Sequence, residues 1–297
     1  EIYTLSLHDA LPISVSENVK QILAEYIAAG LDPERNIIYV QSDVPEIAEM
    51  YLLMNMHAGI GELMRTASFK DKARKALGIA PKKEGEEDNI ECDIVGNETT
   101  SKRVNAGLLT YPTLMAVDIL IHHADFVPVG KDQEQHLELT RRFGRRFNAF
   151  YGVDYFSDPV NFNFGGKAVK VPGLDGSGKM GKSEGNCIYL IDDEKTLRKK
   201  VMRAVTDSLM ELVSEPSTLQ HFKAAYADCS IRYGDLKKQL AEDILKVTLP
   251  IRERILEIRD DEAYLGRIAR HGAERARETA AKTLAEVKHI MGIRPLG

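Results

Sequence analysis

The hydrophobic positions of this chain recur at the spacing of an α-helix over most of its length. Residues 16–29 follow this period, and Gly30 is typical of a helix end. Pro45 is expected to open a second helix, which runs from Glu46 to about Met56. Further helices are predicted at 111–124, 131–152, 194–205, 216–228, 235–257 and 261–290.

Two short apolar runs rich in β-branched residues alternate with these helices. They are "NIIYVQS" at 36–42 and "DFVPVG" at 125–130. Strands that alternate with helices are typical of a parallel sheet covered by helices. The pattern therefore predicts an α/β domain at 15–193, followed by an all-helical domain at 194–297.

Two segments depart from this pattern. Residues 1–14, "EIYTLSLHDALPIS", lack the basic region and apolar core of a signal peptide, and we interpret them as non-native sequence. Residues 81–102 are rich in charge and have no long apolar period, which predicts an exposed, mobile insertion.

The composition is that of a soluble globular protein, with 43% hydrophobic and 29% charged residues. No run approaches the ~20 apolar residues of a membrane helix. The three cysteines form no C-x-x-C pair, so we expect no protein-held metal and no disulfide framework, and a reducing cytoplasmic location. Residues 194–297 hold 20 basic and 16 acidic side chains. This surplus suits a polyanionic partner, although a solvated helical surface would show it too.

One predicted helix carries a candidate binding face. Tyr111, Met115 and Asp118 are spaced i, i+4 and i+7, so they share one side of the helix. Asp118 stands in an apolar stretch, where a carboxylate is costly unless it meets a donor. A ligand N–H is one such donor, with Tyr111 and Met115 as apolar walls. A nearby lysine or the start of another helix is the alternative partner.

A second candidate site follows the run at 125–130. Gly130 comes after the predicted strand, and Asp132 and Gln133 open the next helix. In open α/β sheets, ligands bind beyond the carboxyl ends of strands, close to helix N-termini. Asp132 suits a pair of ribose hydroxyls, and Gln133 suits the ammonium and carboxylate groups of an amino acid. A plain helix N-cap is the alternative interpretation.

The third candidate is the glycine-rich stretch "GLDGSGKMGKSEGN" at 173–186. It matches the phosphate-binding P-loop pattern, but a P-loop needs a helix that starts at its Lys-Ser pair. Here the next residues have turn chemistry and a β-like run, and the next helix is expected near Glu194. We therefore predict a flexible loop that brings Lys179 and Lys182 to a phosphate chain.

Together these motifs resemble the tryptophanyl-tRNA synthetases of class I. "KMGKS" at 179–183 is similar to the class's K-M-S-K-S loop, with Gly181 in place of a serine. "VPVGKDQEQHLELTRRFGRRFN" at 127–148 resembles the family's V-P-V-G-E-D-Q run, with Lys131 in place of glutamate. "GLLTYPTLMAVDIL" at 107–120 is similar to its tryptophan-pocket helix. The resemblance extends over nearly all residues after 15 and implies a Rossmann-like catalytic domain and a helical anticodon-binding domain.

The resemblance implies a tryptophan–tRNA ligase that uses ATP with Mg²⁺, L-tryptophan and tRNA(Trp), as a cytoplasmic homodimer. Tryptophan would be bound by Asp118, which accepts the indole N–H, by Tyr111 and Met115 in the slot, and by Gln133 at the amino-acid end. ATP would be bound by Gly130, Asp132, Lys72, Lys179 and Lys182. The catalytic group would be Lys179, Lys182 and Ser183, which stabilise the leaving pyrophosphate.

One family motif has no counterpart here. The family's early turn around the ATP phosphates is unmatched, and "HAGI" at 57–60 resembles it only superficially. On this basis the chain is expected to be truncated and impaired in activity. A tyrosyl-tRNA synthetase-like enzyme, a P-loop ATPase and a non-catalytic tRNA-binding paralogue are the alternatives.

Overall fold

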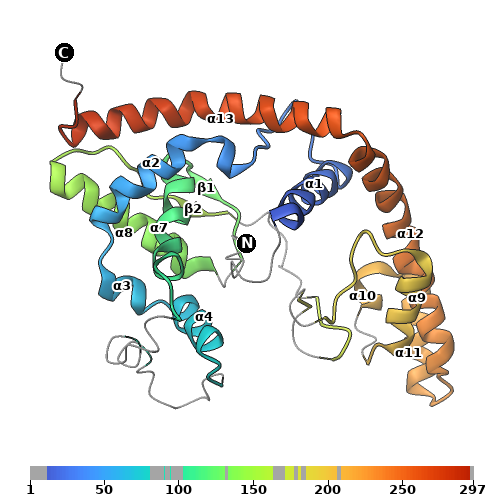
Figure 1. The fold of residues 1–297 in the computed structure, drawn as a ribbon. Helices are drawn as coiled ribbons and strands as arrows, with labels where there is room; N and C mark the ends of the chain where they lie inside the picture. Colours follow the sequence, from blue (N-terminus) through green and yellow to red (C-terminus); the bar gives the residue numbers. More distant parts are fainter. Residues whose placement is uncertain are drawn as a thin grey trace. The chain divides into compact units, whose positions relative to one another are not determined.

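The computed structural model describes two compact units (Figure 1). Outside the described part lie residues 1–11, 81–89, 91–93, 95–102, 131–132, 163–170, 177–179, 182–184, 206–208 and 295–297. The first unit holds the described residues of Ile37–Gly166 and Ala269–Gly297, and the second those of Leu11–Asn36 and Lys167–Ile268. The predicted functional division between residues 193 and 194 stays a prediction.

The first unit is built mainly from helices around a two-stranded sheet. Its elements are η1 Gln41–Asp43, α2 Pro45–Met54, η2 Asn55–His57, α3 Ile60–Met64, α4 Ala67–Leu77, α7 Ala106–Leu120, β1 Phe126–Val127, α8 Glu134–Tyr151, β2 Val160–Asn161 and most of α13 Glu262–Ile290. The strands β1 and β2 are parallel, with Phe126 opposite Val160 and Val127 opposite Asn161.

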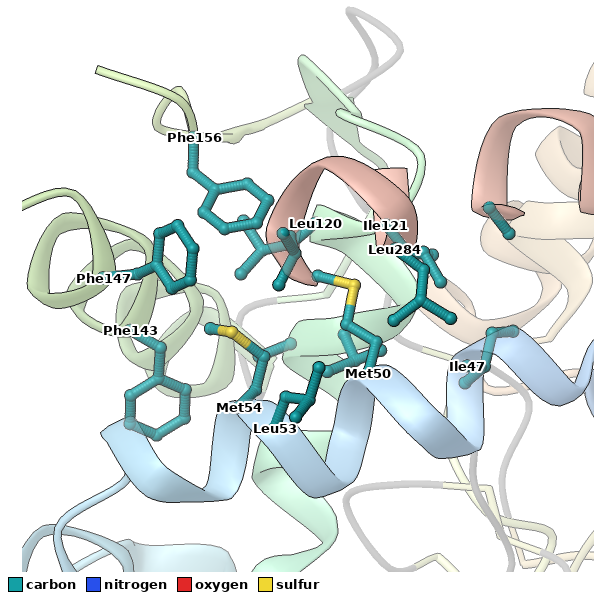
Figure 2. Packing of buried hydrophobic residues seen from close by; sticks show 14 of the residues in the cluster. Ile47, Met50, Leu53, Met54, Leu120, Ile121, Phe143, Phe147, Phe156 and Leu284 are labelled. Atoms are coloured by element: carbon teal, nitrogen blue, oxygen red, sulfur yellow. The ribbon is translucent and has the colours of Figure 1, made fainter. Parts of the chain in front are cut away.

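The core of this unit joins α2, α7 and α8. Figure 2 shows Met54 of α2 pointing toward Phe143 and Phe147 of α8, and all three are fully buried. Leu120 of α7 belongs to the same cluster. Protein cores are close-packed, so large interdigitating side chains leave the helices little freedom to move relative to one another. The core therefore fixes α7, the helix with the candidate binding face.

The C-terminal helix α13 is held on the first unit by apolar packing and ion pairs. Leu284 of α13 enters the core cluster. Arg277 of α13 pairs with Glu46 at 2.9 Å, and Lys288 pairs with Glu49 at 2.7 Å. Exposed ion pairs stabilise little, so the buried face of the helix is the main attachment.

The strand predicted at 36–42 is wrong. Val40 has extended backbone angles, but residues 37–40 join no strand among the described residues, and Gln41–Asp43 form the 3-10 helix η1. The Asp43 amide donates to the Val40 carbonyl at 2.9 Å, which turns the chain toward α2. The same segment packs closely against α13, because a Cβ added at Gly272 would lie 1.8 Å from the Ile38 carbonyl oxygen.

The described elements of the second unit are helices. Its elements are α1 Pro12–Ala28, α9 Glu194–Arg203, α10 Met210–Val213, α11 Pro216–Ala227, α12 Tyr233–Asp260 and the start of α13. Leu197 and Val201 of α9 pack with Leu240 and Ile244 of α12 in its core. Within the described part of the chain, none of the helices combines the length and apolar character that crossing a membrane requires.

Candidate functional site

The candidate binding face lies on α7, which begins at a side-chain cap. Asn105 accepts a hydrogen bond from the Leu108 amide at 2.8 Å, as a good N-cap does. Tyr111 is buried with 7% exposure, whereas Met115 and Asp118 are half-buried. The helical spacing places all three on one face, as predicted.

Asp118 has a partner that the sequence did not single out. The Gln41 side-chain amide donates to both carboxylate oxygens, with Nε2 2.8 Å from each. Burial raises the pKa of Asp118 to about 6, against the lowering effect of the Gln41 hydrogen bond. Burial, and then the charge of Asp118, raise the pKa of Tyr39. Asp118 is thus a costly carboxylate held on an apolar helix. Its donor among the described side chains is Gln41 rather than the lysine or helix start of the alternative interpretation.

Tyr111 is at the centre of a second group. Its hydroxyl lies 3.2 Å from Nε2 of the buried His136 on α8, and the two rings meet edge-on. Nζ of Lys72 on α4 lies 3.8 Å from the centre of the Tyr111 ring, a cation–π distance. Burial raises the pKa of Tyr111. The structure thus joins Lys72, predicted for ATP, to a predicted wall of the tryptophan slot.

The start of α8 follows β1, as the second candidate site requires. Gln133 is the N-cap residue of α8, and its backbone N–H donates to the Gly130 carbonyl at 2.9 Å. This turn brings the exposed Gly130 beside the first turn of a helix that follows a parallel strand. Helix N-termini favour negative charge through their free N–H groups. Asp132, predicted for the ribose, lies outside the described residues.

The glycine-rich loop is tied together by one buried asparagine. The Asn186 side chain accepts from the Gly181 amide at 2.9 Å and donates to Asp175 at 3.0 Å. The Met180 amide donates to the Val171 carbonyl at 3.0 Å, and the Met180 side chain packs on the core of the second unit. These contacts hold Met180 and Gly181, the two described residues that Lys179 and Lys182 flank in the sequence.

The structure supports the rejection of a P-loop. Residues 185–193 contain no helix, and α9 begins at Glu194, as predicted. A P-loop requires a helix N-terminus at its Lys-Ser pair. Lys179, Lys182 and Ser183 themselves lie outside the described residues.

The chain is similar in sequence to a family of known proteins. The model of the family "tRNA synthetases class I (W and Y)" matches residues 9–215. A tryptophan–tRNA ligase of Porphyromonas gingivalis is 56% identical over 95% of this chain and 85% of its own length. This chain belongs to the tryptophanyl-tRNA synthetase family. The matched relatives are enzymes, so the predicted enzyme class is confirmed.

Two further family members agree. A tryptophan–tRNA ligase of Bacillus subtilis is 36% identical over 95% of this chain and 83% of its own length. The crystal structure of the Campylobacter jejuni tryptophanyl-tRNA synthetase, complexed with ADP and tryptophan, matches with a TM-score of 0.78 and 28% identity, over 94% of this chain and 84% of that one. The α/β, Rossmann-like fold is thereby confirmed. The matches lend no support to the expected truncation, to the tyrosyl-tRNA synthetase alternative or to the non-catalytic one.

Sequence reasoning missed two residues of this candidate site. Gln41 follows an apolar extended run and precedes the helix α2, the position where open α/β sheets place ligand-binding side chains. That signal was present, but its partner Asp118 is 77 residues away. His136 lies one turn into α8, three residues after Gln133, and only the fold shows that it meets Tyr111.

Proposed function

We propose that this chain activates L-tryptophan with ATP and transfers it to tRNA(Trp). In the first step, a carboxylate oxygen of tryptophan attacks the α-phosphorus of ATP. A new O–P bond forms, the bond to the β-phosphate bridge breaks, and pyrophosphate leaves. A hydroxyl at the 3′ end of the tRNA then attacks the acyl carbon, and AMP leaves. Membership in the tryptophan–tRNA ligase family supports this reaction.

The observation that carries the tryptophan assignment is the half-buried Asp118 on the apolar face of α7. An ionised carboxylate that accepts from one amide donor among the described side chains keeps further lone pairs for an indole N–H. Tyr111 and Met115 are assigned to the walls of the indole slot, and Gln133 to the amino-acid end. A site built around a substrate N–H can reject analogues that lack it by roughly 10⁴–10⁵.

The phosphate chemistry is assigned to cationic side chains. Lys179, Lys182 and Ser183 stabilise the leaving pyrophosphate, and Lys72 adds a contact to ATP. Fixed cations contribute most where charge develops in the transition state. Gly130 and Asp132 bind the ribose at the start of α8, where the helix end itself favours the nucleotide's negative charge. Mg²⁺ enters as the ATP complex and neutralises phosphate oxygens.

The remaining partners are assigned by the family and by charge. The helices of residues 194–297, with their basic surplus, bind the polyanionic tRNA. The assembly is a cytoplasmic homodimer, as the family resemblance implies. Sedimentation at several protein concentrations tests the dimer, and the salt dependence of tRNA binding tests the charge contribution.

Pyrophosphate exchange tests the reaction itself. Labelled pyrophosphate should enter ATP only when tryptophan is present, and tyrosine should not replace tryptophan. Exchange that proceeds with tyrosine would support the tyrosyl alternative. tRNA binding in the absence of any exchange would support a non-catalytic paralogue.

A further inference from the structure

We infer that Gln41 is a positioning residue that sets recognition of the indole N–H by holding the Asp118 carboxylate. Its Nε2 lies 2.8 Å from both oxygens of that carboxylate. This inference rests on the proposed role of Asp118 as the indole acceptor. It adds a specificity-determining residue that touches Asp118 rather than a reacting atom.

The chemistry of the pair suits this role. A carboxylate oxygen has two lone pairs, so the amide can occupy one direction while another stays open to a substrate donor. A hydrogen bond to an ionised acceptor is shorter and stronger than one to a neutral group. An amide donor favours the ionised form, which opposes the effect of burial on Asp118. Without Gln41, Asp118 would take up a proton more readily and its carboxylate would be free to rotate.

The segment that carries Gln41 is itself fixed in place. The close approach of Gly272 on α13 to the Ile38 carbonyl leaves no room for a side chain at residue 272. Val44, after η1, is 1% exposed and belongs to the core. Gln41 therefore reaches Asp118 from a backbone that is anchored at both ends.

A second contact runs from the same segment to α13. The Tyr39 hydroxyl lies 3.0 Å from Nε2 of His122, two residues past the end of α7, and Nδ1 of His122 lies 2.7 Å from the Thr279 hydroxyl on α13. His122 follows Asp118 by four residues, so Gln41 contacts α7 itself and Tyr39 contacts the turn just after it. Tyr39 and His122 are the titratable neighbours of the pair, and burial lowers the pKa of His122, which favours its neutral form. Near neutral pH, Asp118 is then the charged member of the group formed by Tyr39, Gln41, Asp118 and His122.

The test compares tryptophan with its benzothiophene analogue, which has sulfur in place of the indole N–H. The chain contains no tryptophan, so fluorescence excited at the indole band reports the ligand alone. The affinity of the analogue follows from its displacement of bound tryptophan. Gln41→Met keeps the side-chain length and removes the donor. Gln239→Met is the matched control, because Gln239 donates to Asp243 at 2.9 Å in the second unit.

Gln41→Met should weaken tryptophan binding roughly tenfold or more and leave the analogue nearly unchanged, as expected for a lost hydrogen bond to a charged group. The acidic limb of the pH profile for tryptophan binding should move to higher pH. Gln239→Met should change neither. An equal loss for both ligands would show a merely structural role and overturn the inference, as would wild-type behaviour. If Gln41→Met does not fold, Gln41→Asn replaces it, because the shorter amide cannot reach the carboxylate.

Asp118→Asn separates this inference from the proposed function. If Asp118→Asn still prefers tryptophan to the analogue as wild type does, the indole contact is misassigned and the inference falls with it. If Asp118→Asn loses the preference while Gln41→Met keeps it, the role of Asp118 stands and only that of Gln41 is overturned. Exchange activity with tryptophan in the wild-type chain reports on the reaction independently of both.

Discussion

Replacing Asp118 by asparagine should stabilise the ligand-free fold near neutral pH while it weakens tryptophan binding. The carboxylate has a pKa of about 6 in the fold rather than the ordinary 3.8, because burial disfavours its charge. Each factor of ten in proton affinity corresponds to about 1.4 kcal/mol, so keeping Asp118 ionised costs up to about 3 kcal/mol. Asparagine avoids this cost, and its side-chain oxygen can still accept from Gln41.

The sign of the pH dependence follows from where the proton binds. The folded state holds a proton on Asp118 over a pH range in which the unfolded chain has released it. Wild-type stability should therefore fall as pH rises from about 4 to about 6, and change little from this source above that range. The gain from Asp118→Asn should be near zero at about pH 4 and largest at about pH 7.

Urea unfolding, followed by circular dichroism at several pH values, measures this difference. Asp243→Asn is the control with the opposite sign, because hydrogen bonds from Ser214, Gln239 and Lys246 lower the pKa of Asp243 despite its burial. That variant should lose stability near neutral pH and lose less in acid. The reasoning is refuted if Asp118→Asn is less stable than wild type at about pH 7, or if its gain does not depend on pH.

Four further substitutions test other parts of the molecule. Gly272→Ala should lower the thermal midpoint of unfolding, with a cost of roughly 2 kcal/mol or more, because its Cβ would lie 1.8 Å from the Ile38 carbonyl oxygen. An unchanged midpoint would mean that α13 does not lie against Ile38. Lys179→Ala and Lys182→Ala should each slow pyrophosphate exchange roughly 10²–10³-fold with little change in tryptophan affinity, and a pure affinity loss would contradict the assignment. Gly181→Ser restores the family's hydroxyl and should speed adenylate formation in rapid-mixing experiments; an unaltered rate would reject the role given to this position.

The helices were predictable because their signals are local. Asp193 caps α9 by accepting from the Thr196 amide at 2.6 Å, and the helix starts at Glu194, where the pattern predicts it. The long helices α12 and α13 likewise follow apolar periods that can be read within a few turns. Burial of one face of each helix against a neighbouring helix then adds stability to the helix that the local pattern already favours.

The strand prediction failed because a strand needs a partner that local sequence does not specify. Residues 37–40 have the β-rich composition of a strand, yet α13 lies against the Ile38 carbonyl. Gly272, which permits this approach, is more than two hundred residues away in the chain. β-propensity indicates a fit to a half-buried surface, and a helix can supply that surface as well as a sheet.

The candidate site shows the same division between local and distant information. Helical spacing alone placed Tyr111 and Asp118 on one face of α7, whereas Gln41 and His136 emerged only from contacts across the fold. Asp118 also departs from the local pattern, because it is a carboxylate within a strongly apolar helix. Sequences that specify a fold satisfy local rules nearly everywhere, so a violation that the fold supports with a dedicated donor points to a function that outweighs its cost. Gln41 is that donor, and the stability that Asp118→Asn should recover measures what the chain gives up for its proposed indole acceptor.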